Sequence, residues 1–223
     1  MPGASRYVPA LRFHWLTPAY DLVVGLTTRE KAFRSHLLHQ ADLQPGARVL
    51  DVGCGTGTLA LWAKDRQPEA IVSGLDGDPR IITIARSKAA RAGHDIDFHH
   101  GLSYQLPFRD RTFDSVLSSL FFHHLQPEQK LSTLLEMHRV LRPGGTVHIA
   151  DWGQSSGRVS RGLFYLVQVL DGFSNTRDHV EGRFPPLMRQ AGFVGVEVRG
   201  TVGTIYGSLD LFFGRSADAD YPS

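Results

Sequence analysis

The stretch VLDVGCGTGTLA, residues 49–60, decides the fold of this chain. Its apolar start, which ends in the acid Asp51, predicts a buried strand, and the glycines that follow predict a tight turn. Gly55, Gly57 and Ala60 have the G-x-G-x-x-A spacing of nucleotide-binding turns that join a strand to a helix. The stretch therefore predicts a strand, a ligand-binding loop and the start of a helix.

Short apolar runs repeat the strand signal along the chain. They predict strands at 48–52, 70–75, 96–100, 113–118 and 146–151. Helical patterns separate these runs, and strands that alternate with helices form a parallel sheet covered on both faces. Ligands of such sheets bind at the carboxyl ends of the strands, where the strand order reverses.

Helix signals fall between the predicted strands. One helix is expected from about Thr28 to Gln40, and a second begins after Asp78, which can cap it, and ends at Gly93. A third begins at Pro127. Its expected buried face consists of Leu131, Leu134, Leu135 and His138, with His138 interpreted as a core residue.

The final third of the chain breaks this alternation. A helix is expected near 159–172 and a short helix up to Gln190, followed by strands at 193–200 and 204–215. Two strands joined by so short a link form a hairpin, so the last strand should run antiparallel to its neighbour. The predicted fold class is α/β, with three layers and a seven-stranded mixed sheet.

Length and composition favour one domain. At 223 residues and 42% hydrophobic content, the chain is large enough for one real core. We expect a domain at 46–215, an N-terminal helical cap segment at 1–45 and a flexible tail at 216–223. The net charge of +2 comes from scattered basic residues, which gives little support to nucleic acid as a partner.

Cysteine content and the length of apolar runs indicate the cellular compartment of the protein. The single Cys54 cannot form an intramolecular disulfide, and the first eleven residues lack the apolar core of a secretory signal. No run approaches the ~18–20 apolar residues of a membrane span. We expect a cytoplasmic protein.

The charge of Asp51 bears on the ligand. A dinucleotide would place a pyrophosphate at the start of the helix, where a nearby carboxylate repels it. S-adenosylmethionine carries no phosphate, and its sulfonium and α-ammonium are cations that an acid attracts. Asp76, 19 residues after Gly57, is suited to the ribose that both ligands share. Asp51 thus favours S-adenosylmethionine, with a nicotinamide-dependent oxidoreductase as the weaker alternative.

Four ordered motifs carry a family resemblance: VLDVGCGTG, GLDGDP, GLSYQLPFRDRTFDSVLSSLFFHHL and MHRVLRPGGTVHIADW. Over about residues 20–151 the chain resembles the class I S-adenosylmethionine-dependent methyltransferases. It is most similar to the type 11 group that includes the ubiquinone/menaquinone biosynthesis C-methyltransferases. The resemblance implies a Rossmann-like methyltransferase fold, S-adenosylmethionine as cofactor and S-adenosylhomocysteine as product.

The resemblance also implies which residues hold the cofactor. Asp51 and the loop glycines would hold the methionine end, Asp76 the ribose, and the segment 101–103 the adenine. The cofactor-binding candidates are Tyr20, Asp51, Gly53, Gly55, Gly57, Asp76, Gly77, Ile81, Gly101, Leu102, Ser103 and Ser118. The chain departs from the family at Leu102, where many relatives have an aspartate that accepts a hydrogen bond from the adenine amino group. Backbone carbonyls or the Ser103 hydroxyl would replace it, or cofactor affinity would be lower.

Two histidines follow the fourth predicted strand and are the catalytic candidates. His123 is the first candidate and His124 the weaker one. Histidine can remove a proton near neutral pH, although positioning the acceptor is the favoured role. Asp151 and Trp152 would orient the acceptor or close the sheet. No metal site is expected, since the histidines lack recognisable ligand spacing.

The acceptor is predicted from apolar segments outside the nucleotide-binding pattern. The segment 161–173 is apolar nearly all round, and the N-terminal segment holds four aromatic residues. Both could pack as a cap or form an apolar acceptor pocket, touch a membrane surface or contact a second subunit. A small apolar or aromatic acceptor methylated on carbon or oxygen is favoured, and a non-catalytic S-adenosylmethionine-binding protein is the alternative.

Overall fold

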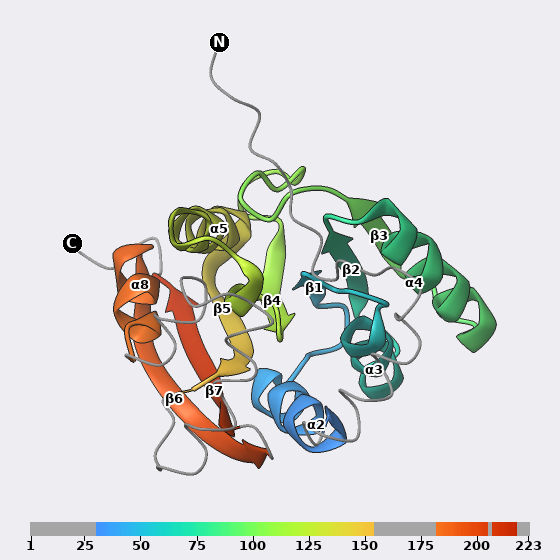
Figure 1. The fold of residues 1–223 in the computed structure, drawn as a ribbon. Helices are drawn as coiled ribbons and strands as arrows, with labels where there is room; N and C mark the ends of the chain where they lie inside the picture. Colours follow the sequence, from blue (N-terminus) through green and yellow to red (C-terminus); the bar gives the residue numbers. More distant parts are fainter. Residues whose placement is uncertain (1–29, 154–181, 205–206, 218–223) are drawn as a thin grey trace.

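The computed structural model describes residues 30–153, 182–204 and 207–217. Within them, seven strands form one sheet in the order β3-β2-β1-β4-β5-β7-β6 (Figure 1). The strands are β1 (Arg48–Val52), β2 (Ile71–Asp76), β3 (Asp97–His100), β4 (Phe113–Ser119), β5 (Leu141–Trp152), β6 (Phe193–Thr204) and β7 (Gly207–Ser216). Strands β1 to β5 are parallel, whereas β7 runs antiparallel to both β5 and β6. The predicted mixed sheet with an antiparallel last strand is confirmed.

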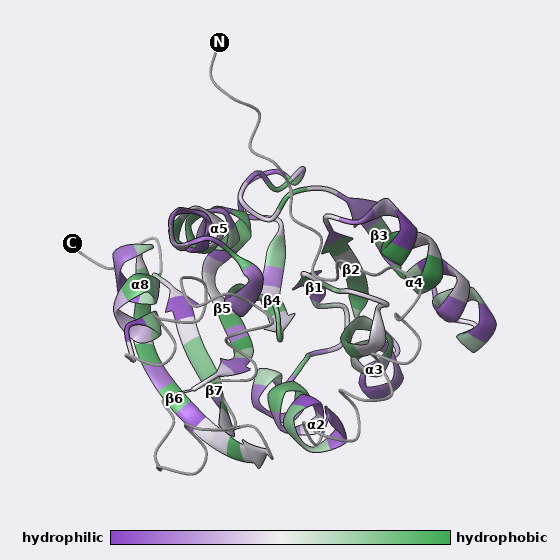
Figure 2. Ribbon diagram, viewed as in Figure 1, coloured by the Kyte–Doolittle hydropathy of each residue, from purple (hydrophilic) through white to green (hydrophobic). Residues whose placement is uncertain are grey.

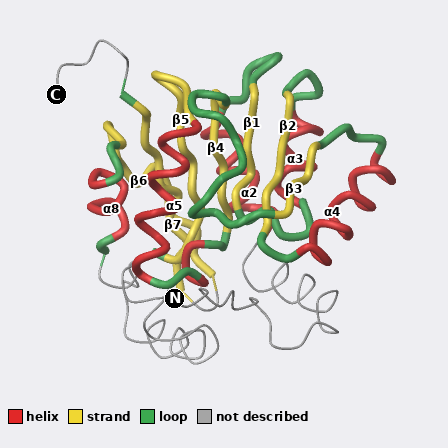
Figure 3. The backbone as a smooth tube through the Cα atoms, turned by 90° about the horizontal axis from the view of Figure 1, so that it is seen from above, coloured by secondary structure: helices red, strands yellow, loops and turns green. Residues whose placement is uncertain are grey.

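Helices cover both faces of this sheet, which gives the predicted three layers. One face carries α2 (Glu30–Ala41), α3 (Thr58–Arg66) and α4 (Pro79–Ala92), and the other carries α5 (Pro127–Val140) and α8 (Phe184–Gln190). The view from above shows α8 beside the β6 end of the sheet and α4 beside the β3 end (Figure 3). Hydrophobic residues follow the strands and the helix sides that face them, with hydrophilic residues on the outer helix surfaces (Figure 2).

Helix α4 begins and ends where its sequence signals predict. The Asp78 side chain accepts a hydrogen bond from the Arg80 backbone N–H at 2.8 Å, and Pro79 occupies the first turn. Gly93 ends the helix in the left-handed conformation, with φ 72°. The cap and the stop fix the helix directly after the end of β2.

Helix α5 begins at Pro127 as predicted, but the predicted buried face is wrong in part. Leu134 is fully buried, whereas Leu135 is 47% exposed and His138 only half-buried. The buried face instead includes Lys130 and Thr133, together with Met137 and Val140. Polar residues can be buried when they have partners, and the Thr133 hydroxyl lies 2.8 Å from the Ser103 hydroxyl. The pattern of apolar residues alone therefore predicts the buried face of α5 incorrectly.

Strand β5 begins five residues earlier than predicted. Leu141 already pairs with Phe113, and a register shift between Phe113 and Ser115 absorbs the RPGG turn, where Gly144 has φ 74°. The predicted helix near 159–172 lies outside the described residues. None of the described helices is long and apolar enough to cross a membrane.

The order of the strands places the site. Sheet order reverses between β1 and β4, which lie side by side at the centre of the sheet. Ligands of such sheets bind outside the carboxyl ends of the strands at this switch point. The glycine loop 53–57 follows the carboxyl end of β1 at this position.

Candidate functional site

The glycine loop is tied to the end of β2 by hydrogen bonds. The backbone N–H groups of Gly53 and Cys54 both donate to the Leu75 carbonyl, at 2.8 and 3.0 Å. The Gly55 N–H donates to the Asp76 carboxylate at 2.9 Å. The loop and the acid at the end of β2 therefore form one fixed unit.

The three loop glycines are required for different reasons. All have positive φ, which favours glycine. A Cβ at Gly53 would lie 2.2 Å from the Phe121 ring, and one at Gly57 would lie 2.8 Å from the Phe98 ring. A Cβ at Gly55 would meet none of the described residues within 4 Å. Packing within the protein thus explains Gly53 and Gly57, and Gly55 is the loop glycine beside which the described residues leave space.

Asp51 is a buried acid whose side chain has no hydrogen-bond partner in the described part of the chain. The residue is 1% exposed, and neither carboxylate oxygen accepts a hydrogen bond. Burial raises its pKa to about 7, an effect that the Arg34 guanidinium and the Ala60 backbone N–H oppose and that the Asp76 carboxylate reinforces. An ionised carboxylate left this way is costly unless it takes up a proton or a ligand supplies a cation or a donor.

Asp76 is held in a defined orientation at the end of β2. One carboxylate oxygen accepts from the Gly55 N–H, and the other accepts from the Asp78 N–H at 3.0 Å. Burial raises its pKa, and these backbone hydrogen bonds oppose the rise. Gly77 follows directly, and Ile81 is half-buried in the first turn of α4. The end of β2 and the first turn of α4 therefore lie together beside the loop.

The segment after β3 lies on the same edge of the sheet. The Gly101 N–H donates to the Asp76 backbone carbonyl at 3.0 Å, and Leu102 is half-buried. Ser103 is buried, and its hydroxyl lies against Thr133 of α5. The Ser103 hydroxyl thus has a partner within the protein.

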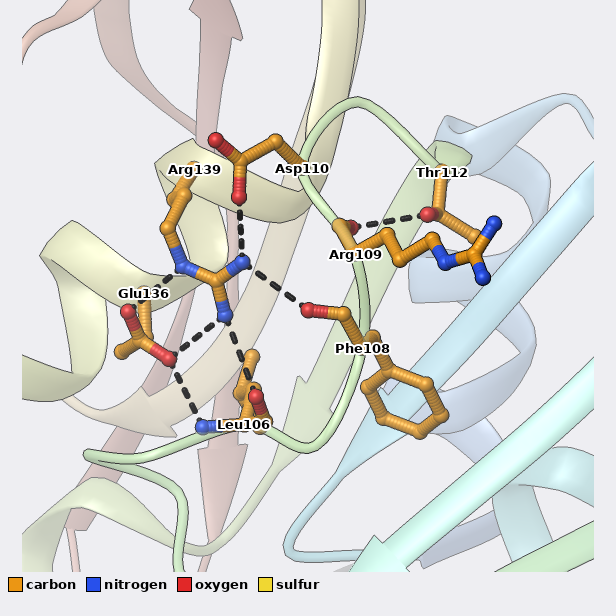
Figure 4. Close-up of polar contacts among 7 residues, drawn as sticks. All are labelled: Leu106, Phe108, Arg109, Asp110, Thr112, Glu136 and Arg139. Atoms are coloured by element: carbon orange, nitrogen blue, oxygen red, sulfur yellow. Dashed lines mark hydrogen bonds and ion pairs between the residues drawn. The ribbon is translucent and has the colours of Figure 1, made fainter.

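Arg139 of α5 anchors the loop that follows this segment (Figure 4). Its guanidinium binds Glu136 at 2.7 Å and Asp110 at 2.6 Å, and it donates to the Phe108 and Leu106 carbonyls at 2.9 and 3.1 Å. Glu136 also accepts from the Leu106 N–H at 2.7 Å. Arg139 holds the pKa of Glu136 below its usual range. This network fixes residues 106–110, a few positions after the predicted adenine segment.

The end of β4 holds the predicted Ser118 and, beyond it, Phe121, which sequence reasoning missed. Ser118 is buried, and its hydroxyl donates to the Val52 carbonyl at 2.8 Å and so ties β4 to β1. Leu120 has φ 52°, which is unusual for a residue with a side chain. Next to it, Phe121 packs its ring on Gly53. The apolar run SSLFF predicted a strand end, but no pattern in it indicated this contact.

His123 lies in a short 3-10 turn, η2 (Phe122–His124), and is held by Asp151. Its Nδ1 lies 2.8 Å from the Asp151 carboxylate, and the residue is 3% exposed. The same carboxylate accepts from the backbone N–H groups of Phe121, Phe122 and Trp152 at 3.0, 2.8 and 2.8 Å. Asp151 therefore closes the end of β5 onto the turn and orients His123.

His124 lies beside His123, with ring centroids 4.0 Å apart. Burial lowers its pKa to about 3, and the neighbouring His123 adds to the effect. Its imidazole is therefore neutral in the physiological range. No group of three His, Cys, Asp or Glu residues in the described ranges is arranged to hold a metal.

The structure thus brings most of the predicted site residues to one edge of the sheet. Asp51, the glycine loop, Asp76 and the segment 101–103 surround the ends of β1, β2 and β3. His123 stands beyond the end of β4. Tyr20, the N-terminal aromatic residues and the apolar segment 161–173 lie outside the described residues.

This strand order, with a glycine loop after β1 and an acid at the end of β2, defines the class I methyltransferase architecture. The methyltransferase domain family model matches residues 49–145. Over this stretch the chain is similar to the methyltransferase domain that its motifs predict.

Individual relatives agree with this assignment. A demethylmenaquinone methyltransferase of Thermus thermophilus is 34% identical over 142 residues, covering 63% of this chain and 64% of that protein. The chain thus spans less than two-thirds of the length of that relative. A structure of a putative methyltransferase from Bacillus halodurans has a TM-score of 0.67 at 20% identity, covering 82% of this chain and 98% of that one. The [4+2]-cyclase SpnF has a TM-score of 0.69 at 17% identity, covering 84% and 82%.

Proposed function

We propose that this protein transfers a methyl group from S-adenosylmethionine to a carbon or oxygen atom of a small apolar or aromatic acceptor. The observation that carries the proposal is the buried Asp51 carboxylate, which has no hydrogen-bond partner in the described part of the chain. A cationic ligand group would offset the cost of burying it, whereas a pyrophosphate would increase that cost. The space that the described residues leave beside Gly55 gives room for such a ligand.

The residues around the loop fit this cofactor. Asp51 would hold the α-ammonium, and Asp76 is already oriented by two backbone N–H groups to accept from the ribose hydroxyls. Gly101 and Leu102 would border the adenine. When bound, S-adenosylmethionine supplies an electrophilic methyl group on a sulfonium.

The acceptor class is proposed from the relatives. They carry the name demethylmenaquinone methyltransferase, which supports an acceptor of the quinone type. A quinone ring is electrophilic, so the carbon that gains the methyl group must belong to the reduced hydroquinone. That ring carbon would take the methyl group in exchange for its own proton, which a base of the protein would accept, and S-adenosylhomocysteine would be the leaving group.

His123 is proposed to position the acceptor and to take that proton. The Asp151 carboxylate next to Nδ1 favours the tautomer with the proton on Nδ1, which leaves Nε2 as the basic nitrogen. Asp151 acts through His123 and is a positioning residue. The neutral His124 would add a polar but uncharged neighbour.

Calorimetric titration and product release test the proposal. S-adenosylmethionine and S-adenosylhomocysteine should bind, NAD should not, and S-adenosylhomocysteine should be released with a hydroquinone, a phenol or an amine as acceptor. His123→Ala should lower turnover and change S-adenosylhomocysteine affinity less than about twofold, whereas His94→Ala, at the far end of α4, should leave both unchanged. Preference for NAD overturns the cofactor assignment, and unaltered turnover in His123→Ala removes that residue from the mechanism.

A second candidate function retains the cofactor without methyl transfer. The observation that favours it is Leu102, whose side chain stands where many relatives have an acceptor for the adenine amino group. Tight S-adenosylmethionine binding with no S-adenosylhomocysteine release from any acceptor would favour this alternative. The cytoplasmic location, a homodimer and contact with a membrane surface stay predictions, which size-exclusion chromatography and vesicle sedimentation address in part.

A further inference from the structure

The side chain of Phe121 brings the turn that carries His123 into contact with the glycine loop. Its ring lies so close to Gly53 that a Cβ there would lie 2.2 Å from the nearest ring atom. Close-packed atoms resist compression, and the bare backbone of a glycine has no side chain that could move aside. The ring therefore sets how near the glycine loop and the residues after β4 can come to each other.

The backbone of the same residue is fixed to the end of β5. The Phe121 N–H donates to one oxygen of the Asp151 carboxylate at 3.0 Å. The other oxygen of that carboxylate lies 2.8 Å from the His123 Nδ1. Phe121 thus contacts the glycine loop with its ring, and its N–H shares a single acceptor group with His123.

An unfavourable backbone conformation directly precedes this ring. Leu120 has φ 52°, in the left-handed region that a residue with a side chain seldom adopts. Its N–H donates to the Ala150 carbonyl at 2.8 Å. Leu120 packs with the core cluster of Leu59 and Ala60, whereas Phe121 packs with the cluster on the other face of the sheet. Such conformations persist where the surroundings fix them, and they are common at functional sites.

We propose that Phe121 is a positioning residue for methyl transfer, which sets the distance between the loop that holds the cofactor and the turn that holds His123. The inference rests on the proposed function, since it concerns the same reaction. Methyl transfer requires the acceptor atom in line with the methyl carbon, and a displacement of about 1 Å can cost about 100-fold in rate. A ring held on both sides limits such displacements.

Phe121 has a purely structural alternative role, in which its ring only fills space. The ring is half-buried and forms an edge-to-face contact with Phe122, with centroids 5.7 Å apart. Phe108 is a close match, because it is half-buried, packs with the same core cluster and contacts Phe113 edge to face at 5.1 Å. Loss of either ring should lower stability. Only loss of the Phe121 ring should also act on His123 and on turnover.

The first test needs neither ligand nor activity. Gly53→Ala presses a Cβ on the Phe121 ring and should shift the NMR signals of the His123 imidazole, which are assigned by their loss in His123→Ala. Gly55→Ala is the matched control, since Gly55 also has positive φ but a Cβ there meets none of the described residues within 4 Å. It should leave the signals in place.

A double substitution shows whether the ring carries this effect. In Phe121→Ala, adding Gly53→Ala should shift the His123 signals much less, because the ring atoms at 2.2 and 2.3 Å are gone and only the Cβ at 2.8 Å stays. Signals that do not move in Gly53→Ala, or that move equally with and without the ring, overturn the proposal. Thermal unfolding shows whether each variant folds, and the second test decides if Gly53→Ala does not.

The second test measures turnover. Phe121→Ala should lower kcat by about 10- to 100-fold and change S-adenosylhomocysteine affinity less than about threefold. Phe121→Tyr keeps the ring and should retain most of kcat, and Phe108→Ala should keep kcat within about threefold of the unaltered protein. A kcat that falls no further in Phe121→Ala than in Phe108→Ala means that the ring only fills space, which overturns the proposal. If the unaltered protein binds no S-adenosylmethionine, the proposed function fails, and the first test still decides whether Phe121 links the loop to His123.

Discussion

Asp51 in β1 and Asp151 in β5 are equally buried, yet their surroundings are opposite. Asp51 is 1% exposed with no side-chain hydrogen bond from the described residues, while Asp151 is 0% exposed and accepts four N–H groups. Hydrogen bonds supplied by the fold stabilise the buried Asp151 carboxylate, whereas the side chain of Asp51 has none from the described residues and its pKa is raised to about 7. Burial of an acid is therefore no guide to function until its hydrogen bonds are accounted for.

The largest expected effect is the loss of Asp151. Asp151→Ala leaves three backbone N–H groups and one imidazole N–H without their acceptor, at about 1–3 kcal/mol for each donor that stays buried. The free energy of unfolding should fall by at least about 3 kcal/mol, measured by urea denaturation. Asp151→Asn keeps one acceptor oxygen and should lose less. A stability equal to that of the unaltered protein would show that these hydrogen bonds do not hold the turn.

The same kind of substitution at Asp51 should have the opposite sign. Because the folded-state pKa of Asp51 is raised to about 7, the folded protein binds more protons than the unfolded chain between about pH 4 and 7. The free energy of unfolding therefore falls as the pH rises through that window. Asp51→Asn has no carboxyl group at this position, so its free energy of unfolding should not fall in this way. The ligand-free variant should be more stable than the unaltered protein, by roughly 2 kcal/mol more at pH 8 than at pH 5.5.

Urea denaturation at the two pH values measures this difference. Asp42→Asn, at the end of α2, is a control for adding an amide at a site that is not buried. If Asp51→Asn destabilises the ligand-free protein at pH 8, the carboxylate has a partner in the fold, and the contrast with Asp151 fails.

A smaller effect concerns how cofactor affinity varies with pH. An ammonium binds the ionised carboxylate, so S-adenosylmethionine affinity should rise as Asp51 loses its proton near pH 7. Affinity should be about tenfold lower at pH 6 than on the plateau, and Asp51→Asn should be weaker throughout and nearly independent of pH. Calorimetry between pH 5.5 and 7.5 avoids the range in which α-amino groups of pKa about 8 lose their own proton. A flat profile in the unaltered protein would mean that Asp51 is ionised before the ligand arrives.

The position of the glycine loop could be predicted from the sequence because its signals are local. A strand, a glycine loop and a capped helix specify one another over a few residues, so the sequence predicts Asp51, Gly55 and Asp76 beside the end of the sheet, where the structure has them. The reasons for individual glycines were not predictable. Gly53 and Gly57 face the rings of Phe121 and Phe98, which are distant in the sequence.

Contacts between distant segments explain the other limits. The buried face of α5 depends on Ser103, 30 residues before Thr133, which supplies a partner for a polar side chain that periodicity assigns to solvent. The role of Asp151 likewise depends on a turn 28 residues earlier in the chain. Patterns along the chain identify which residues can do chemistry, but partners across the sheet decide which of them are already used.

The smallest expected effect tests the adenine end, where the chain departs from its family. Leu102 is half-buried after β3, and Ser103 beside it is engaged with Thr133, so neither side chain is arranged to accept from an adenine amino group. Leu102→Asp should therefore strengthen S-adenosylhomocysteine binding by about 2- to 10-fold, the gain from one hydrogen bond. S-inosylhomocysteine lacks the amino group and should show no gain, and Leu102→Ala controls for the loss of the leucine side chain. An equal gain with the inosine ligand would mean that the added acid acts through its charge rather than through the adenine edge.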